Sequence, residues 1–184
     1  MKENDLRIYL PDENIQESGY LEAMLNNFSA SYKLYWFRGI FREVLNGKKE
    51  MTYKRVVARM IAAAWFPVLY YHLSLGFSDK LTEAVSYVHE NLGISQEKRE
   101  EYLTDYICSS QDSNLLQMIG NLTNMVPTRL IRPFYEQLVN EKRVKDKSFN
   151  DSKMDRFIRE CNESYQGDVL YRIEEKEDAC RINF

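Results

Sequence analysis

An uncharged stretch in the first half of the chain constrains the fold more than any other feature. No residue between Arg59 and Asp79 carries a formal charge, and most residues from Ala62 to Tyr71 are apolar. A membrane span needs about 20 mainly apolar residues, but Pro67 and Gly76 interrupt this stretch. We therefore expect a central helix that is buried on most of its sides, and no membrane span.

The composition is that of one ordinary globular domain. The chain has 184 residues, 44% of them hydrophobic, with only 7 Gly and 4 Pro, so it can bury a core without disulfides or metals. Its three cysteines form no C-x-x-C pair, and with only two histidines no zinc-site spacing exists. We expect no cofactor and no metal in this chain. The polar N-terminus, without an apolar leader, predicts a cytoplasmic location.

Hydrophobic spacing predicts two long helices in the first half of the chain. The first runs from about Ser31 to Asn46, and the second begins after Thr52 as its N-cap. Pro67 is expected to kink or restart the second helix. Apolar residues share one face of the first helix: Leu34, Phe37, Ile40, Phe41, Val44 and Leu45. The inner stripe of the second consists of Tyr53, Val56, Val57, Met60, Ile61 and Ala64.

Capping residues and helix breakers predict the later elements. Pro127 and Pro133 bracket a break between helices. The helices expected on either side of it begin after Ser78, at Ser95 and after Asp112 or Ser113, and then cover Phe134–Lys142 and Asp151–Glu163.

These patterns predict a mainly α fold, with a bundle-like domain of about six helices at residues 1–167 and a small C-terminal β hairpin at 168–184. Residues 169–173 and 179–184 are the expected hairpin strands, and 6–10 a further short strand. Because the chain stops on an apolar strand pattern, residues 168–184 are alternatively the start of a following module in a longer protein.

Positive charge is concentrated in one block. Residues 33–75 carry eight basic and two acidic side chains, whereas the whole chain has a net charge of −3. Arg38 and Arg42 lie one helical turn apart, as do Arg55 and Arg59. If the two helices pack as an antiparallel pair, these cations could flank one surface and hold phosphates by releasing counterions. The alternative is that they are ordinary solvated helix faces.

No catalytic motif is present in the sequence. The chain has no G-x-S-x-G frame, no P-loop and no G-x-G-x-x-G. Pro11-Asp12 and Glu174-Glu175-Lys176 match fragments of a Mg²⁺-nuclease pattern, but they lie far apart in the chain. Glu97, Glu100 and Glu101 are more simply a solvated helix face. We therefore predict no catalytic residue.

Several short segments follow one another in an order that resembles a known family. They are Ser29–Phe37 (SASYKLYWF), Arg55–Met60, Ala64–Val68 and Val126–Phe134, and Ile8–Pro11 fits the same pattern. Together they resemble the N-terminal region of bacterial HNH endonuclease-domain proteins, over residues 8–184. In such proteins the nuclease module lies C-terminal to this region and uses histidines and an asparagine around a metal. This chain contains no Asp-His pair, so no catalytic residue carries over.

The resemblance implies the non-catalytic N-terminal domain of an HNH-type nuclease, which positions nucleic acid or a regulatory partner. The expected partners are DNA, a C-terminal nuclease module or a second copy of the chain. The phosphate contacts that we expect are Arg38, Arg42, Lys54, Arg55 and Arg59, with Arg129 and Arg132 as secondary contacts. Arg129 and Arg132 are equally suited to capping helix ends or to pairing with carboxylates.

Two other classes of function stay open at this point. One is a protein-interaction or dimerisation module without a nucleic-acid role, whose interface consists of Tyr32, Tyr35, Trp36 and Tyr70. The other is an enzyme with a small-molecule pocket, which would require titratable groups that converge in one cavity.

Overall fold

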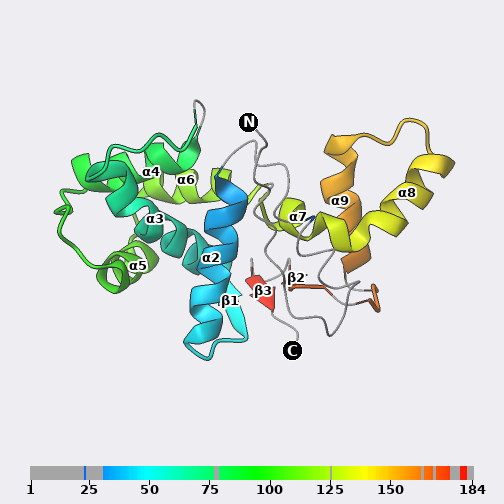
Figure 1. Ribbon diagram of the computed structural model, residues 1–184, viewed down its shortest axis with the longest axis horizontal. Helices are drawn as coiled ribbons and strands as arrows, with labels where there is room; N and C mark the ends of the chain where they lie inside the picture. The colour runs from blue at the N-terminus through cyan, green and yellow to red at the C-terminus, as the bar shows by residue number, and fades with distance from the viewer. Residues whose placement is uncertain are drawn as a thin grey trace, which may run out of the picture.

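The structure is a computed structural model. It describes residues 23, 31–76, 79–124, 126–162, 164–167, 169–174 and 179–181. The predicted strand at 6–10 lies outside these residues. The described residues form a mainly α fold, as the hydrophobic spacing predicts, with α-helices α2 to α9, one 3₁₀ helix and three short strands (Figure 1).

The uncharged stretch forms the central helix of the fold. Helix α3 (Tyr53–Leu69) begins at Thr52, whose side chain accepts a hydrogen bond from the Arg55 N–H, and 12 of its 17 residues are buried. Such burial on most sides confirms the prediction for this stretch. Within the described ranges, no helix has both the length and the apolar character needed to cross a membrane.

Four helices pack around α3. They are α2 (Tyr32–Leu45), α4 (Lys80–Glu90), α5 (Glu100–Ser109) and α6 (Ser113–Thr123). Each of the side chains of Asp79 and Asp112 accepts hydrogen bonds from the first backbone N–H groups of the helix that follows it, α4 and α6 respectively. Asp79, rather than the expected Ser78, is thus the N-cap of α4. It is also bound by the Ser31 hydroxyl, so it ties the start of α2 to the start of α4.

The second half of the chain extends away from this group. Helix α7 (Val126–Ile131) packs against α2, α6 and α9 (Asp151–Asn162), and the 3₁₀ helix η1 (Arg132–Tyr135) leads into α8 (Glu136–Lys145). In Figure 1, α8 and α9 lie at one end of the molecule and α4 and α5 at the other, with α2 between them.

The predicted C-terminal hairpin is confirmed, and a third strand joins it. Strands β2 (Arg172–Glu174) and β3 (Ala179–Arg181) are antiparallel, and β3 also pairs with β1 (Glu50–Thr52), which gives the strand order β1-β3-β2. Three residues are too few for a strand pattern, so β1 could not be found from sequence alone. The division of the chain into domains at residue 167 stays a prediction.

Prolines account for the other differences from the predicted elements. Helix α3 runs through Pro67 without restarting, because only two helical residues follow it and little of the helix depends on the missing N–H. Pro127 and Pro133 do not bracket a break. Each lies in the first turn of a short helix, α7 or η1, where a proline nitrogen has no helical partner to lose. The described residues therefore include two short helical segments, α7 and η1, where we expected a break.

Candidate functional site

Helix α2 buries a different face from its apolar one. Its buried residues are Trp36, Gly39, Ile40 and Glu43, whereas Leu34, Phe41 and Leu45 are 52%, 51% and 61% exposed. Of the apolar set that shares one face in the sequence, only Ile40 is buried.

Gly39 explains this choice of face. A Cβ at this position would lie 3.0 Å from the Val56 carbonyl oxygen and 3.3 Å from the Arg59 Cβ. The missing side chain lets α2 approach α3 closely along the line of Gly39, which brings its neighbours Trp36 and Glu43 inside. Close packing of the two backbones therefore decides the orientation of α2, ahead of its larger apolar side chains.

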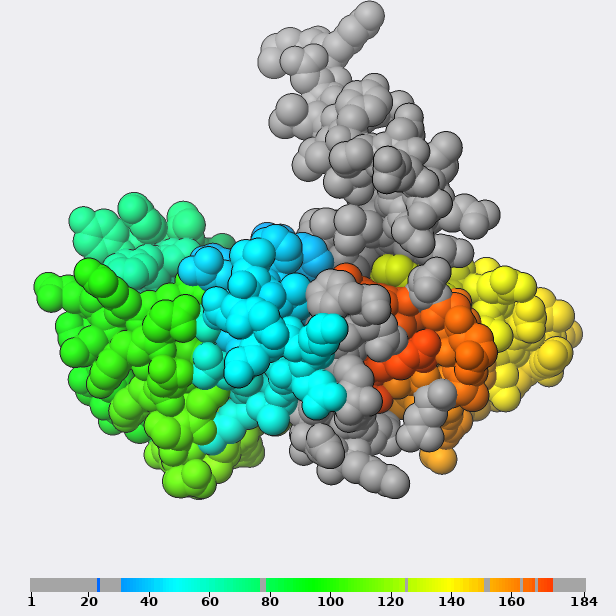
Figure 2. Space-filling model, turned by 90° about the horizontal axis from the view of Figure 1, so that it is seen from below, coloured from blue at the N-terminus to red at the C-terminus, as the bar shows by residue number. Residues whose placement is uncertain are grey.

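Three exposed residues and the half-buried Phe37, which also packs against the core, form a strip that we call the α2 stripe: Leu34, Phe37, Phe41 and Leu45. They are spaced three to four residues apart, so they follow one line along the helix. The rings of Phe37 and Phe41 stack with centroids 6.2 Å apart. Figure 2 shows the blue-to-cyan atoms of α2 and its following turn at the surface in the middle of one face.

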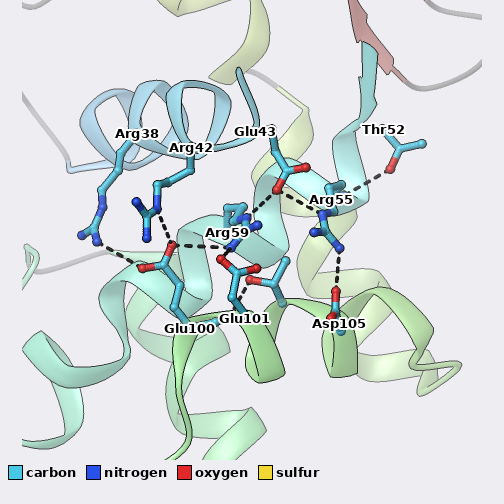
Figure 3. Close-up of polar contacts among 10 residues, drawn as sticks. Arg38, Arg42, Glu43, Thr52, Arg55, Arg59, Glu100, Glu101 and Asp105 are labelled. Atoms are coloured by element: carbon cyan, nitrogen blue, oxygen red, sulfur yellow. Dashed lines mark hydrogen bonds and ion pairs between the residues drawn. The ribbon is translucent and has the colours of Figure 1, made fainter. Parts of the chain in front are cut away.

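The predicted basic residues do come together, but with carboxylates among them. Arg38 and Arg42 extend from α2 toward α5, and Arg55 and Arg59 extend from α3 into the space between α2 and α5 (Figure 3). We call the set the arginine–carboxylate network; it consists of Arg38, Arg42, Arg55 and Arg59 with Glu43, Glu100, Glu101 and Asp105.

The centre of this network is a buried ion pair. The side chains of Arg59 and Glu43 are 1% and 3% exposed, and the Arg59 Nε donates to Glu43 Oε1 at 2.5 Å. The same carboxylate oxygen lies 3.2 Å from the Arg55 Nε, and Arg55 also donates to Asp105 at 2.8 Å. One acidic residue of α2 is therefore held by two guanidinium groups of α3.

The outer part of the network is built around α5. The Arg38 Nη2 donates to Glu100 Oε2 at 3.3 Å, and the Arg42 Nε lies 3.6 Å from Glu100 Oε1. Next to it, Glu101 accepts from the Arg59 Nη1 at 2.7 Å. Glu97 and Glu101 are exposed, as the prediction of a solvated face has it, but Glu100 is half-buried, because packing of α5 against α3 places it beside the arginines.

Ionisation in the network follows these contacts. Burial acts to lower the pKa of Arg59, but the hydrogen bonds to Glu101 and Glu43 outweigh it and raise that pKa above its ordinary value. The hydrogen bond from Arg59 lowers the pKa of Glu101. Both groups are therefore more firmly charged than they would be in the unfolded chain.

Two buried polar atoms of the network lack hydrogen bonds. They are the Arg59 Nη2 and the Glu100 Oε1, both buried. The Glu100 oxygen is still 3.7 Å from the Arg59 Nη1, so it contributes an ion pair without a hydrogen bond. A buried polar atom without a hydrogen bond costs stability, so these two atoms offset part of what the network contributes.

The remaining predicted contacts lie elsewhere. The Lys54 Nζ donates to the Ser110 carbonyl at 2.8 Å, at the C-terminal end of α5. Arg129 and Arg132, on α7 and η1, lie near Lys33 at the start of α2. Burial, followed by the positive charges of Arg132 and Arg129, lowers the pKa of Lys33. The fold thus places four of the seven predicted cations in the network and leaves Lys54 outside it. Arg129 and Arg132 join Lys33, which was not predicted, in a second cluster that we call the α7 cluster: Lys33, Arg129 and Arg132.

The predicted aromatic interface is not a single surface. Trp36 is fully buried, and its indole N–H donates to the Tyr171 hydroxyl. Tyr32 and Tyr35 are partly buried, whereas Tyr70 is exposed at the end of α3. The assignment of Trp36 to an interface is wrong, because it occupies the buried face of α2 that Gly39 selects.

No constellation of catalytic type was found within the described ranges. They contain no group of three or more His, Cys, Asp or Glu that could hold a metal ion. A shallow hollow on the outer side of α8 is lined by Glu136, Gln137, Asn140, Glu141 and Val144. All five come from one helix, whereas catalytic groups converge from several elements.

The sequence contains one sign of the arginine–carboxylate network, but this sign does not predict the network without knowledge of which helices pack together. Glu43 is the only acid between residues 31 and 49, and it lies within a basic segment. An isolated acid among arginines indicates a buried pair only when the partner helix is known, and sequence does not supply the pairing of helices. The α2 stripe was visible as a pattern, but its outward direction was not.

Comparisons with known proteins do not assign this site. Scans of family models, of curated proteins and of solved structures each gave no match. The resemblance to HNH endonuclease-domain proteins is therefore carried by the sequence segments alone.

Proposed function

We propose that this chain is a non-catalytic accessory domain, of the type that precedes the nuclease module in HNH endonucleases, and that it acts by binding another protein. The sequence resemblance supplies the nuclease setting. The α2 stripe carries the proposal, because it exposes a line of large apolar side chains on a helix whose opposite face is buried.

The ion pairs argue against phosphate binding by the four network arginines. A phosphate on Arg59 would have to displace Glu43 or Glu101, and Glu43 would then be a buried carboxylate without its closest partner. Arg38 and Arg42 are about half exposed, but both are already attracted to Glu100. These arginines are better suited to holding α2, α3 and α5 together.

A cytoplasmic location is part of the proposal. Cys108 and Cys161, the two cysteines whose side chains are described, are both free thiols. Burial raises the pKa of each. Unpaired, unreactive thiols are usual in a reducing compartment.

Nucleic-acid positioning is a second candidate, favoured by the α7 cluster. Burial and, after it, the nearby charges of Arg132 and Arg129 lower the pKa of Lys33, so cations from two distant parts of the chain lie close together. A polyanion could relieve this repulsion between like charges. This candidate assigns the phosphate contacts to Arg129 and Arg132 rather than to the network.

A DNA titration separates the two candidates. We would measure fluorescence anisotropy of labelled duplex and single-stranded DNA at low and physiological salt. Binding of protein partners predicts no specific DNA affinity. Salt-sensitive binding that Arg129→Ala/Arg132→Ala weakens, while Arg55→Ala does not, would establish the second candidate instead.

Site-specific cross-linking tests the proposed function directly. A photoreactive benzoyl-phenylalanine would replace Phe41 in the α2 stripe or, as the control, Val144 on α8, which is 82% exposed. In cells that express the chain, we expect discrete protein adducts from position 41 and none from position 144. Equal adduct patterns at the two positions would mean that the stripe has no partner.

A further inference from the structure

The size of the α2 stripe limits what can cover it. From Leu34 to Leu45 it extends over about three helical turns, or roughly 17 Å at 1.5 Å per residue. Its exposed apolar area is on the order of 400 Å², about half of the ~800 Å² that each partner buries in a standard interface. This area fits the apolar face of one helix better than it fits a large, stable dimer interface.

The exposed charges on α2 and the turn that follows it are positive, and the first exposed acid after them, Glu50, begins β1. Arg38, Arg42, Lys48 and Lys49 are all exposed, and the only acid from residue 31 to 49, Glu43, is buried. Two of these cations share the single carboxylate of Glu100, so their positive charge is only partly compensated. The other two, Lys48 and Lys49, lie in the turn that follows α2, and their side chains make no hydrogen bond or ion pair with the described residues.

From this juxtaposition we infer that the α2 stripe binds an acidic amphipathic helix of a partner protein. The inference rests on the proposed function and names its partner class. Apolar side chains of the partner helix, at positions i, i+3 or i+4 and i+7, cover the stripe, and its flanking Asp or Glu residues face Lys48 and Lys49.

The same charges disfavour the other occupants. A second copy placed with α2 against α2 would bring two sets of cations together, which costs binding free energy. An anionic membrane also attracts basic amphipathic helices. However, the side chains of Arg38 and Arg42 extend toward Glu100 on α5 (Figure 3), which leaves Lys48 and Lys49 at one end of the stripe, too few for the rim of positive charge that membrane binding needs.

The test uses two designed peptides and the full chain. Both peptides are labelled 16-residue helices with Leu at i, i+4, i+7 and i+11; one has Glu at the flanking positions and the other has Lys. We expect the Glu peptide to bind at least about tenfold more tightly than the Lys peptide in fluorescence anisotropy, and to lose this advantage at high salt.

Three variants locate the binding. Phe41→Ser should weaken binding of the Glu peptide by about tenfold or more, because a central aromatic anchor is lost. Lys48→Glu/Lys49→Glu leaves the stripe intact and should weaken it by roughly three- to tenfold through charge alone. Val144→Ser on α8 is the matched control and should change nothing. Circular dichroism of each variant shows that the fold is retained.

The outcomes distinguish the inference from the proposed function. Equal affinity for the Glu and Lys peptides, or insensitivity to Phe41→Ser, overturns the acidic-helix partner. So does a doubled mass in light scattering that Phe41→Ser abolishes, or flotation with vesicles that contain phosphatidylserine. In each of these cases, a position-41 adduct with another protein would leave the proposed function standing. Without such an adduct, both fail.

Discussion

Glu43 shows how a single residue can be both costly and necessary. A buried carboxylate is unfavourable by itself, and here two arginines of α3 neutralise it while Glu101 binds the far side of Arg59. Removing one member weakens this compensation, because Arg59 without Glu43 keeps only the acids of α5, and Glu43 without Arg59 keeps only Arg55. Replacing both members by apolar residues removes the cost of burying the two charges together with the ion pair.

The first prediction therefore concerns both members of this pair. Glu43→Gln should lower the free energy of unfolding by about 2–4 kcal/mol, because Arg59 stays charged and buried. The double variant Glu43→Leu/Arg59→Met should recover most of that loss. Urea denaturation followed by tryptophan fluorescence measures both.

An exposed pair provides the control for this prediction. Lys80 and Glu83 form an ion pair on α4 with both side chains more than half exposed, so Glu83→Gln should cost less than about 0.5 kcal/mol. A Glu43→Gln loss as small as that of the control would show that the buried pair does not stabilise the fold.

The second prediction concerns pH. Arg59 lowers the folded-state pKa of Glu101 below its ordinary value of 4.5. The ionised form is therefore favoured by folding. Its contribution to stability is fully present above pH 4.5 and is lost as the pH falls through the lower folded-state pKa. Because Glu101 is largely exposed, the contribution is less than about 1 kcal/mol.

Glu101→Gln should consequently change how the free energy of unfolding falls at acidic pH. The stability difference between the native chain and Glu101→Gln should be constant from pH 6 to 8 and should shrink below about pH 4.5. Urea midpoints measured at each pH provide the readout. A difference that grows on acidification would contradict the assigned direction of the pKa shift.

At the scale of elements, α2 and α3 determine the candidate site together. Hydrophobicity alone predicts that α2 buries the α2 stripe against the core. Instead, the face that contains Gly39 packs on α3. Trp36 and Glu43 then gain partners on α3 and beyond that they could not reach in the other orientation. The pair of helices thus creates the exposed stripe and the buried network at once.

The third prediction tests this close approach. Gly39→Ala adds a methyl group 3.0 Å from the Val56 carbonyl oxygen, and the expected overpacking outweighs the higher helix propensity of alanine. We expect a net loss of about 1 kcal/mol in the free energy of unfolding.

Gly120 in α6 is the matched control for that substitution. A Cβ at this position meets nothing within 4 Å, so Gly120→Ala should raise stability by roughly 0.5–1 kcal/mol. If both variants are stabilised in urea denaturation, the contact between α2 and α3 is looser than the structure indicates.

For the whole molecule, Tyr171 connects parts that are distant in the chain. Its hydroxyl accepts from the Trp36 indole N–H at 3.1 Å and donates to the Pro127 carbonyl at 2.5 Å. It thereby ties α2, α7 and the segment before β2 together in the core. The pairing of β1 with β3 also joins the segment after α2 to the C-terminal part of the chain.

The fourth prediction removes this hydroxyl. Tyr171→Phe leaves a buried indole N–H and a carbonyl without their partner, and should lower the free energy of unfolding by about 1–3 kcal/mol. Tyr70→Phe, at an exposed tyrosine, should stay within about 0.5 kcal/mol of the native chain. Equal effects would show that Tyr171 is not a structural tie.

The sequence by itself determined the mainly α class, the buried central helix, the C-terminal hairpin and the absence of a recognisable catalytic motif. Each of these depends on local periodicity or residue type, which a linear pattern records. The tertiary structure alone decided which face of α2 is buried, that the network arginines are paired with carboxylates, and that β1 completes the sheet. These depend on which surfaces of distant elements meet. The close approach at Gly39 and the burial of Glu43 beside Arg59 have no signature until both helices are in place.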